Sequence, residues 1–323
     1  GVPNAQHEAR FNYGLGMTDQ TSLVDQRIDE LLAELDPAAT DPVEFRGRQY
    51  DLGLAWVHFP DGYGGLGFKP VVQRQIDERL YGAGARRAGV RHFFGLTMAG
   101  PTIVTNGNDA VRQRLLRRAF TGEDAWCQLF SEPGAGSDLA GLTTTARLDG
   151  DEWVVSGQKV WNTSAHHVDL GLLVARTDWD VPKHNGLTYF VLPMRQPGVE
   201  VRPLRQMNEH RSFNEVFLSE ARVPRDHVVG EVGGGWRVAL TTLAFERRFG
   251  ALARPSFAPS GGRAVEEARA EAAGYFETYK WYPQRAGRAD LVVSQAQAMG
   301  AAADPVVRQE IARLHALQRV SRW

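Results

Sequence analysis

The feature that most constrains the fold is a change of pattern in the middle of the chain. From about residue 125 to residue 224, short Val- and Leu-rich runs are separated by Pro, Gly and Asp turns. Runs of this kind are typical of strands in a sandwich or barrel. Apolar residues recur at helical spacing on both sides of this region. The sequence therefore predicts an α+β multi-domain chain: an N-terminal α-helical domain at residues 1–122, a middle β-barrel or sandwich domain at 123–228 and a C-terminal helical bundle at 229–323.

The individual elements follow from the same periodicities. Strands are expected at 142–148, 153–161, 170–175, 188–192, 199–203 and 215–218. Helices are expected at 22–35, 42–52, 71–81, 93–105, 109–119, 236–249 and 265–279, and after residue 304. Asn108 is the expected N-cap of the fifth helix, and Asp304-Pro305 is a typical helix start.

The last expected helix has an apolar stripe with no visible partner. The stripe consists of Val307, Ile311, Leu314 and Leu317, and the sequence stops at Trp323 without a C-cap. An apolar face needs to be covered by another element. The C-terminal domain is therefore expected to be truncated here, and further helices or another subunit would complete it.

Charge and cysteine content limit the classes of function. Lys and Arg number 37 against 38 Asp and Glu, so no basic excess indicates a nucleic-acid partner. The single cysteine, Cys127, lies in an apolar run and is expected to be a buried packing residue. Without disulfides, a signal peptide or an apolar run of about 18 residues, the expected location is the cytoplasm, with no membrane span.

Two short patterns suggest sites that we do not expect. Gly62, Gly64 and Gly67 satisfy GxGxxG, but helical segments precede them, so a dinucleotide-binding βαβ unit is not predicted. His166 and His167 are adjacent and have no suitably spaced Cys or acidic partner. No metal site is therefore predicted.

The Gly-rich bend in Phe130–Asp138 suggests a phosphate-binding loop. Glu132-Pro133 opens it, and Gly134-Ala135-Gly136 is followed by Ser137-Asp138. Glycines allow the backbone to approach a ligand closely, and successive N–H groups can converge on a phosphate or pyrophosphate.

A hairpin and a polar strand end follow this bend. The turn Asp149-Gly150-Asp151 separates two strand-like runs, and the second run ends at Trp161-Asn162-Thr163. A flat ring beside an amide and a hydroxyl can cover one face of a planar cofactor and hydrogen-bond its edge.

Together the two segments resemble a known family. The run Ser131–Asp138, followed by Gly157–Thr163, is similar to the flavin-binding middle domain of acyl-CoA dehydrogenases. The resemblance implies FAD as cofactor, with Trp161 against the isoalloxazine and Thr163 at its N5 edge. The full set of implied FAD contacts is Gln128, Phe130, Ser131, Gly136, Ser137, Trp161, Thr163 and Arg285.

The resemblance also implies a catalytic base after the β-domain. Glu246-Arg247 lies at the same distance from Gly235-Trp236 as the Glu-Arg pair of some family members. By helical spacing alone, Glu246 lies on or beside the face carrying Leu240 and Leu243, where burial would make it a stronger base. The alternative is a surface ion pair with a neighbouring arginine. The implied substrate contacts are Ser137, Ala244, Phe245 and Arg247.

Two departures from the family pattern stand out. Ala244 replaces the acidic residue that often lies two positions before the base. The region around Arg285 lacks the usual Phe for adenine stacking, although Arg285 is kept as a candidate phosphate contact.

The predicted function is dehydrogenation of an acyl-CoA to a trans-2-enoyl-CoA, with electrons passing to an electron-transfer flavoprotein. The resemblance also implies a homo- or hetero-oligomer. Two alternatives stay open: a non-catalytic subunit of a heteromeric acyl-CoA dehydrogenase, and a flavin monooxygenase or oxidase on the same scaffold.

Overall fold

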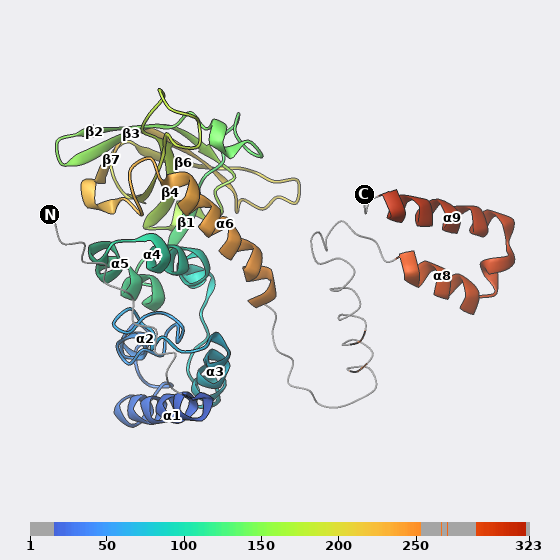
Figure 1. Cartoon of the computed structure of the whole chain (residues 1–323), viewed down its shortest axis with the longest axis horizontal. Helices are drawn as coiled ribbons and strands as arrows, with labels where there is room; N and C mark the ends of the chain where they lie inside the picture. Colours follow the sequence, from blue (N-terminus) through green and yellow to red (C-terminus); the bar gives the residue numbers. More distant parts are fainter. Residues whose placement is uncertain (1–15, 253–265, 267–269, 271–288, 321–323) are drawn as a thin grey trace. The chain divides into compact units, whose positions relative to one another are not determined.

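The computed structural model describes residues 16–252, 266, 270 and 289–320. These residues fall into two compact units that meet between Arg254 and Pro255 in the sequence. In Figure 1 the first unit has helices below a β-sheet, and the second unit contains the helices α8 and α9. We describe each unit by itself.

The N-terminal part of the first unit is helical, as predicted. Its helices are α1 (Met17–Glu34), α2 (Pro42–Asp51), α3 (Gln73–Gly82), α4 (Gly100–Asn106) and α5 (Asp109–Thr121). Asn108 caps α5 by accepting a hydrogen bond from the Val111 N–H at 2.9 Å, which confirms the expected cap. The expected helix at 93–105 is divided into a π-helical turn, Gly95–Ala99, and α4, because Pro101 cannot donate a backbone hydrogen bond.

The loop with the GxGxxG pattern lies within this helical part. Gly62, Gly64 and Gly67 all have positive φ angles and belong to a turn-rich segment between α2 and α3. No βαβ unit surrounds them in the described residues of the first unit. The glycines therefore serve local turns.

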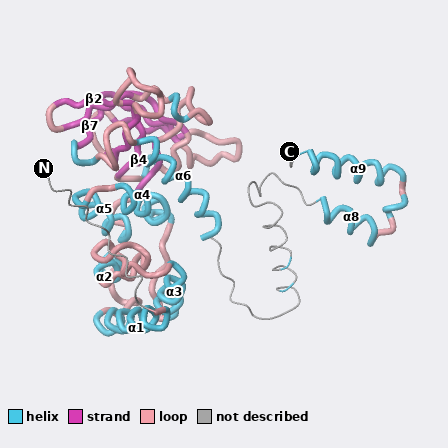
Figure 2. Tube along the Cα trace, viewed as in Figure 1, coloured by secondary structure: helices cyan, strands magenta, loops and turns pink. Residues whose placement is uncertain are grey.

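Seven strands form one hydrogen-bonded sheet (Figure 2). They are β1 (Trp126–Leu129), β2 (Thr145–Asp149), β3 (Glu152–Val160), β4 (Leu170–Arg176), β5 (Leu187–Pro193), β6 (Val199–Pro203) and β7 (Asn214–Pro224). The order is β1-β4-β2-β3-β7-β6, and β5 pairs with β4. Cys127 is fully buried in β1, as expected.

β7 is longer than the sequence predicts. The expected strand covers residues 215–218, but the pairing with β3 continues to Pro224 after an irregularity opposite Val155–Gly157. Glu220, with φ +56°, lies at this bulge. A bulge changes the alternation of side chains, so the second half of the strand did not match a simple period of two.

Apolar residues bury both faces of the sheet. One cluster joins the sheet to α4, α5 and α6 (Gly235–Leu252) through residues such as Trp126, Leu172 and Val238. A second cluster, containing Val155 and Phe190, fills the other face. Both faces of the central strands are therefore buried, whereas β6 at the edge of the sheet is largely exposed.

The second unit contains α8 (Ala289–Ala298) and α9 (Pro305–Val320). Asp304 caps α9 through its carboxylate, which accepts the Val306 N–H at 2.8 Å, as predicted. Val307 and Ile311 are half-buried, whereas Leu314 and Leu317 are 39% and 57% exposed, so within this described unit the apolar stripe of α9 is covered only in part. The expected helix at 265–279 lies outside the described ranges.

Among the helices that the structure describes, none has the length and apolar character needed to cross a membrane.

The close packing of the backbone at Gly157 in β3 predicts that adding a single methyl group there destabilises the fold. A Cβ at Gly157 would lie 2.7 Å from the Thr144 Cα, which is backbone and cannot move aside easily. We expect Gly157→Ala to lower the free energy of unfolding by about 1–3 kcal/mol, measured by urea denaturation.

Gly82→Ala is the matched control, because a Cβ at the end of α3 meets nothing within 4 Å. The control should be no less stable than the wild type, because alanine has a higher helix propensity than glycine. Equal stability of both variants would show that β3 and Thr144 are not packed this closely.

Candidate active site

Three segments meet at the end of β1. The Asn162 side chain, just after β3, donates a hydrogen bond to the Gln128 carbonyl oxygen at 2.9 Å. The Gln128 side-chain amide in turn lies 3.4 Å from a carboxylate oxygen of Glu246 on α6. The structure therefore brings the predicted base to the strand that was predicted to line the flavin, next to the Trp161–Thr163 segment.

A buried ion pair joins the two motifs. The Lys159 ammonium lies 2.9 Å from a carboxylate oxygen of Glu132, and neither side chain is more than 4% exposed. Lys159 also donates to the Phe130 carbonyl oxygen at 2.9 Å. Glu132 accepts further hydrogen bonds from Thr143 and Thr144 at 2.7–2.9 Å. Charge and hydrogen bonding are thus satisfied without water.

The pair is ionised at neutral pH. Burial by itself raises the pKa of Glu132, but the Lys159 charge and the hydrogen bonds from Thr144, Thr143 and Lys159 outweigh it, and the pKa falls to about 2. Burial lowers the pKa of Lys159 to about 8, against the opposing effect of Glu132. Both values leave the carboxylate negative and the ammonium positive at pH 7.

The Gly-rich bend is open to the outside. A Cβ placed on Gly134 or Gly136 would meet no atom within 4 Å, and neither residue has a positive φ angle. Internal packing therefore gives no reason for these glycines. Ser137 is exposed beside them, and Asp138 forms a surface ion pair with Lys183 at 2.7 Å. An open, glycine-lined bend fits the close approach of an external ligand.

Trp161 projects from the end of β3. Its indole is 62% exposed, and its backbone lies in the left-handed region with φ +64°. The Phe213 ring supports it edge-on, with centroids 6.0 Å apart. A bulky residue in this backbone region is unusual and indicates a functional constraint. The exposed ring offers a flat surface to a planar ligand.

A cavity of about 500 Å³ lies beside Thr163. Phe93, Phe94 and Trp126 contribute aromatic walls, and Ser164 lies next to Thr163 in the lining. The buried Trp126 Nε1 has no hydrogen-bond partner among the described residues. Aromatic walls with a few polar groups are typical of a cofactor or ligand site.

α6 is fixed to the sheet and to α4 by a chain of buried hydroxyls. The Thr242 hydroxyl lies 2.9 Å from the Tyr189 hydroxyl of β5 and 3.0 Å from the Thr102 hydroxyl of α4. All three side chains are fully buried. Glu246 follows Thr242 by four residues, one helical turn. The hydroxyl chain therefore sets the rotation of the helix that carries Glu246.

The expected burial of Glu246 is wrong for this chain. The buried face of α6 carries Val238, Ala239 and Thr242, whereas Leu240 is 47% exposed. Glu246 continues the buried stripe, but this part of the helix extends past the packed domain and Glu246 is exposed. Among the residues whose side chains are described, the hydrogen bond to Glu246 comes from Gln128, and the alternative of an ion pair with a neighbouring arginine such as Arg248 lies outside the described side chains.

The remaining predicted contacts differ in placement. Phe130 is buried against Tyr189, edge to face, rather than open to a ligand. Ala244 and Arg247 are exposed near Glu246, and Phe245 is half-buried. Arg285 lies outside the described residues.

The Glu132–Lys159 pair and the hydrogen bond from Asn162 to the Gln128 carbonyl oxygen were not predicted from the sequence. The signal for the pair was a lysine within an otherwise strand-like run, 27 residues after an acidic residue of the other motif. The buried side-chain carbonyl oxygen of Asn162 has no partner in the described part of the chain.

Models of two protein domains match the chain. Residues 20–123 match the acyl-CoA dehydrogenase N-terminal domain, and residues 127–220 match the acyl-CoA dehydrogenase middle domain. The first match covers the N-terminal helices, and the second covers most of the sheet, including the Glu132–Lys159 ion pair and Trp161. The chain belongs to the acyl-CoA dehydrogenase family.

Individual relatives of the chain support the same family. The chain is 48% identical over 220 residues to acyl-CoA dehydrogenase FadE34 of Mycobacterium tuberculosis, covering 68% of this chain and 30% of that protein. It is 42% identical over 222 residues to acyl-CoA dehydrogenase IpdE1 of the same organism, covering 68% and 57%. The chain thus spans less than two thirds of these curated relatives.

Among solved structures, an acyl-CoA dehydrogenase from Geobacillus kaustophilus is similar with a TM-score of 0.53 and 25% identity, over 97% of this chain and 78% of that one.

The ion pair predicts a large loss of stability when one partner is removed. Lys159→Met leaves the Glu132 carboxylate buried and unpaired, which should cost about 3–5 kcal/mol of unfolding free energy. The double variant Glu132→Gln/Lys159→Met should recover part of this loss. Both are measured by chemical denaturation at pH 7.

Lys183→Met is the matched control, because it removes the exposed partner of Asp138 and should cost less than about 1 kcal/mol. Equal losses for Lys159→Met and Lys183→Met would contradict the account.

The ion pair also predicts how stability depends on pH. Since folding lowers the pKa of Glu132 from 4.5 to about 2, its stabilising contribution is complete above about pH 4.5 and is lost as pH falls toward 2.

Proposed function

We propose that this chain forms the flavin and thioester site of an FAD-dependent acyl-CoA dehydrogenase. The reaction removes hydrogen from Cα and Cβ of an acyl-CoA and gives a trans-2-enoyl-CoA. The observation that carries the proposal is the contact between Gln128 and Glu246 at the end of β1, beside Asn162. In this contact a carboxylate of the following helix lies beside β1, and the Gln128 carbonyl oxygen of that strand accepts a hydrogen bond from Asn162, the residue after Trp161.

The described residues fit a flavin. The open bend at Gly134 and Gly136 suits the pyrophosphate, and the exposed indole of Trp161 suits the ring system. The cavity beside Thr163, with its unpaired indole N–H of Trp126, provides further polar and apolar contacts. When bound, FAD supplies a hydride acceptor at N5. The residues that would hold it are Gln128, Ser131, Gly136, Ser137, Trp161 and Thr163, with Phe130 behind them and Arg285 as a further candidate.

Glu246 would accept the proton from Cα of the substrate. A general base must lie within hydrogen-bond reach of the proton that it removes. The hydroxyl chain through Thr242 fixes the helix, and Gln128 holds the carboxylate by its amide. An acyl chain entering this region would displace water from the exposed carboxylate and so strengthen its interaction with the α-proton.

The thioester would lie between the bend and α6. Ser137 on the bend is exposed, as are Ala244 and Arg247 on α6, and Phe245 is half-buried beside them. The arginine offers a positive charge for a phosphate of CoA. We further propose an electron-transfer flavoprotein as electron acceptor and a homo- or hetero-oligomeric assembly.

A non-catalytic subunit of a heteromeric acyl-CoA dehydrogenase is the second candidate. The exposure of Glu246 and the alanine at position 244 favour it. A purified protein without a flavin spectrum would support this candidate, whereas a flavin that acyl-CoA reduces would exclude it.

The base assignment predicts that Glu246→Gln retains FAD but loses its reduction. The amide keeps the shape of the carboxylate but cannot take the α-proton, so we expect anaerobic flavin bleaching by an acyl-CoA panel to slow by about 10²–10⁴-fold. The measurement is stopped-flow absorbance of the flavin.

Glu231→Gln is the matched control, because Glu231 is exposed just before α6. It should bleach at the wild-type rate. Normal bleaching by Glu246→Gln would show that another group removes the proton.

A further inference from the structure

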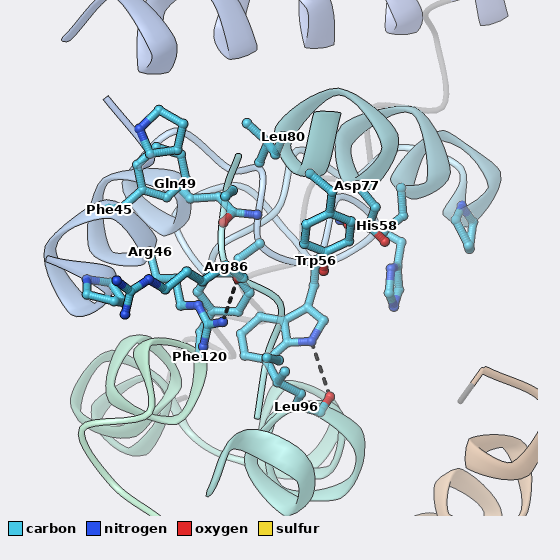
Figure 3. A pocket seen from close by; sticks show the side chains of 18 residues that line it. Phe45, Arg46, Gln49, Trp56, His58, Asp77, Leu80, Arg86, Leu96 and Phe120 are labelled. Atoms are coloured by element: carbon cyan, nitrogen blue, oxygen red, sulfur yellow. Dashed lines mark hydrogen bonds between the residues drawn. The ribbon is translucent and has the colours of Figure 1, made fainter. Parts of the chain in front are cut away.

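A second cavity lies within the N-terminal helical domain. It has a volume of about 300 Å³ and lies among α2, α3 and the segments that follow them. Figure 3 shows its lining, which includes the apolar side chains of Phe45, Trp56, Leu80, Leu96 and Phe120. None of its lining residues belongs to the cavity beside Thr163. Its volume is at the lower end of the range for small-molecule sites.

Arg46 brings a buried positive charge to this cavity. The residue is 7% exposed. Its Nη2 donates to the Arg86 carbonyl oxygen at 3.0 Å (Figure 3), whereas its buried Nη1 has no partner among the described residues. Burial lowers the pKa of Arg46, but an arginine side chain remains charged in proteins. Both N–H groups of Nη1 therefore lack an acceptor, and no carboxylate pairs with the guanidinium among the described residues.

None of the nearby titratable groups in the described residues forms an ion pair with Arg46. Asp77 also lines the cavity, but its carboxylate accepts a hydrogen bond from Gln73 at 3.2 Å, and burial raises its pKa. Burial lowers the pKa of His58, whose Nδ1 is a second buried atom without a partner in the described chain. The Tyr81 phenol is neutral, because burial raises its pKa further. A buried charge without a counter-ion is costly, so an anionic ligand would stabilise this arrangement.

Aromatic side chains form one part of the cavity wall. Trp56 stacks on Phe59 with ring centroids 4.8 Å apart, and Phe120 meets Trp56 edge-on at 5.0 Å. The Trp56 indole N–H is already used by the Leu96 carbonyl oxygen at 3.2 Å. Trp56 therefore presents only apolar surface to a ligand.

We propose that this cavity binds a small carboxylic acid, with its carboxylate on Nη1 of Arg46 and its apolar body against Trp56 and Phe120. A volume of 300 Å³ corresponds to about ten non-hydrogen atoms, at roughly 30 Å³ for each water-sized group. A charged guanidinium is the preferred protein partner of a carboxylate. The site is separate from the proposed flavin site and does not depend on it.

Calorimetric titration of the full chain tests the proposal with two ligands that differ only in the head group. Octanoate should bind about 10–100-fold more tightly than octan-1-ol, because only octanoate neutralises the buried arginine. The variant Arg46→Met should lose this preference. Arg74→Met is the matched control, since it removes an exposed arginine of α3 and should keep the wild-type preference.

Three results would overturn the proposal: no octanoate binding to the wild type, equal binding of octanoate and octan-1-ol, or unchanged octanoate affinity in Arg46→Met. Inorganic phosphate that binds as tightly as octanoate would also overturn it, because the apolar walls would then have no role. The comparison of the two ligands uses the wild type, so it decides the question even when Arg46→Met does not fold.

Discussion

The attraction between Glu132 and Lys159 is the interaction on which the candidate site depends. Neither charge has access to water, so each needs the other, and the Phe130 carbonyl oxygen and two threonines complete the arrangement. Separating them would leave a buried charge unpaired, at a cost comparable to a large part of the stability of a domain. The bend after β1 and the end of β3 are therefore held in one relative position.

The Glu132–Lys159 pair also determines the positions of the segments next to it. Trp161 directly follows β3, the strand that carries Lys159; its backbone lies in the left-handed region and its ring is exposed. The next residue, Asn162, donates a side-chain hydrogen bond to the Gln128 carbonyl oxygen. On the other side, the hydroxyls of Thr102, Thr242 and Tyr189 fix α6. Glu246 lies one helical turn after Thr242, and its carboxylate contacts the side-chain amide of Gln128.

Much of the fold could be predicted from local patterns, because caps and periodic apolar residues act over short distances. Asn108 and β6 at Val199–Pro203 are examples. The length of β7 could not be predicted from local patterns, because the bulge opposite Gly157 depends on pairing with β3, which is distant in the sequence. The exposure of Glu246 depends on where the packed domain ends along α6, and helical spacing does not contain that information. The unpaired Arg46 is a tertiary effect of the same kind, because its burial comes from segments far apart in sequence.

Under the proposed function, a planar flavin would lie against the exposed indole of Trp161. The most direct measurement is titration of the flavin-free protein with FAD, followed by quenching of tryptophan fluorescence. Trp161→Phe should weaken FAD binding about 5–10-fold and remove a large part of the quenching, whereas Trp179→Phe, which removes a comparably exposed indole of the same domain, should change neither. Identical titrations for the two variants would contradict the account.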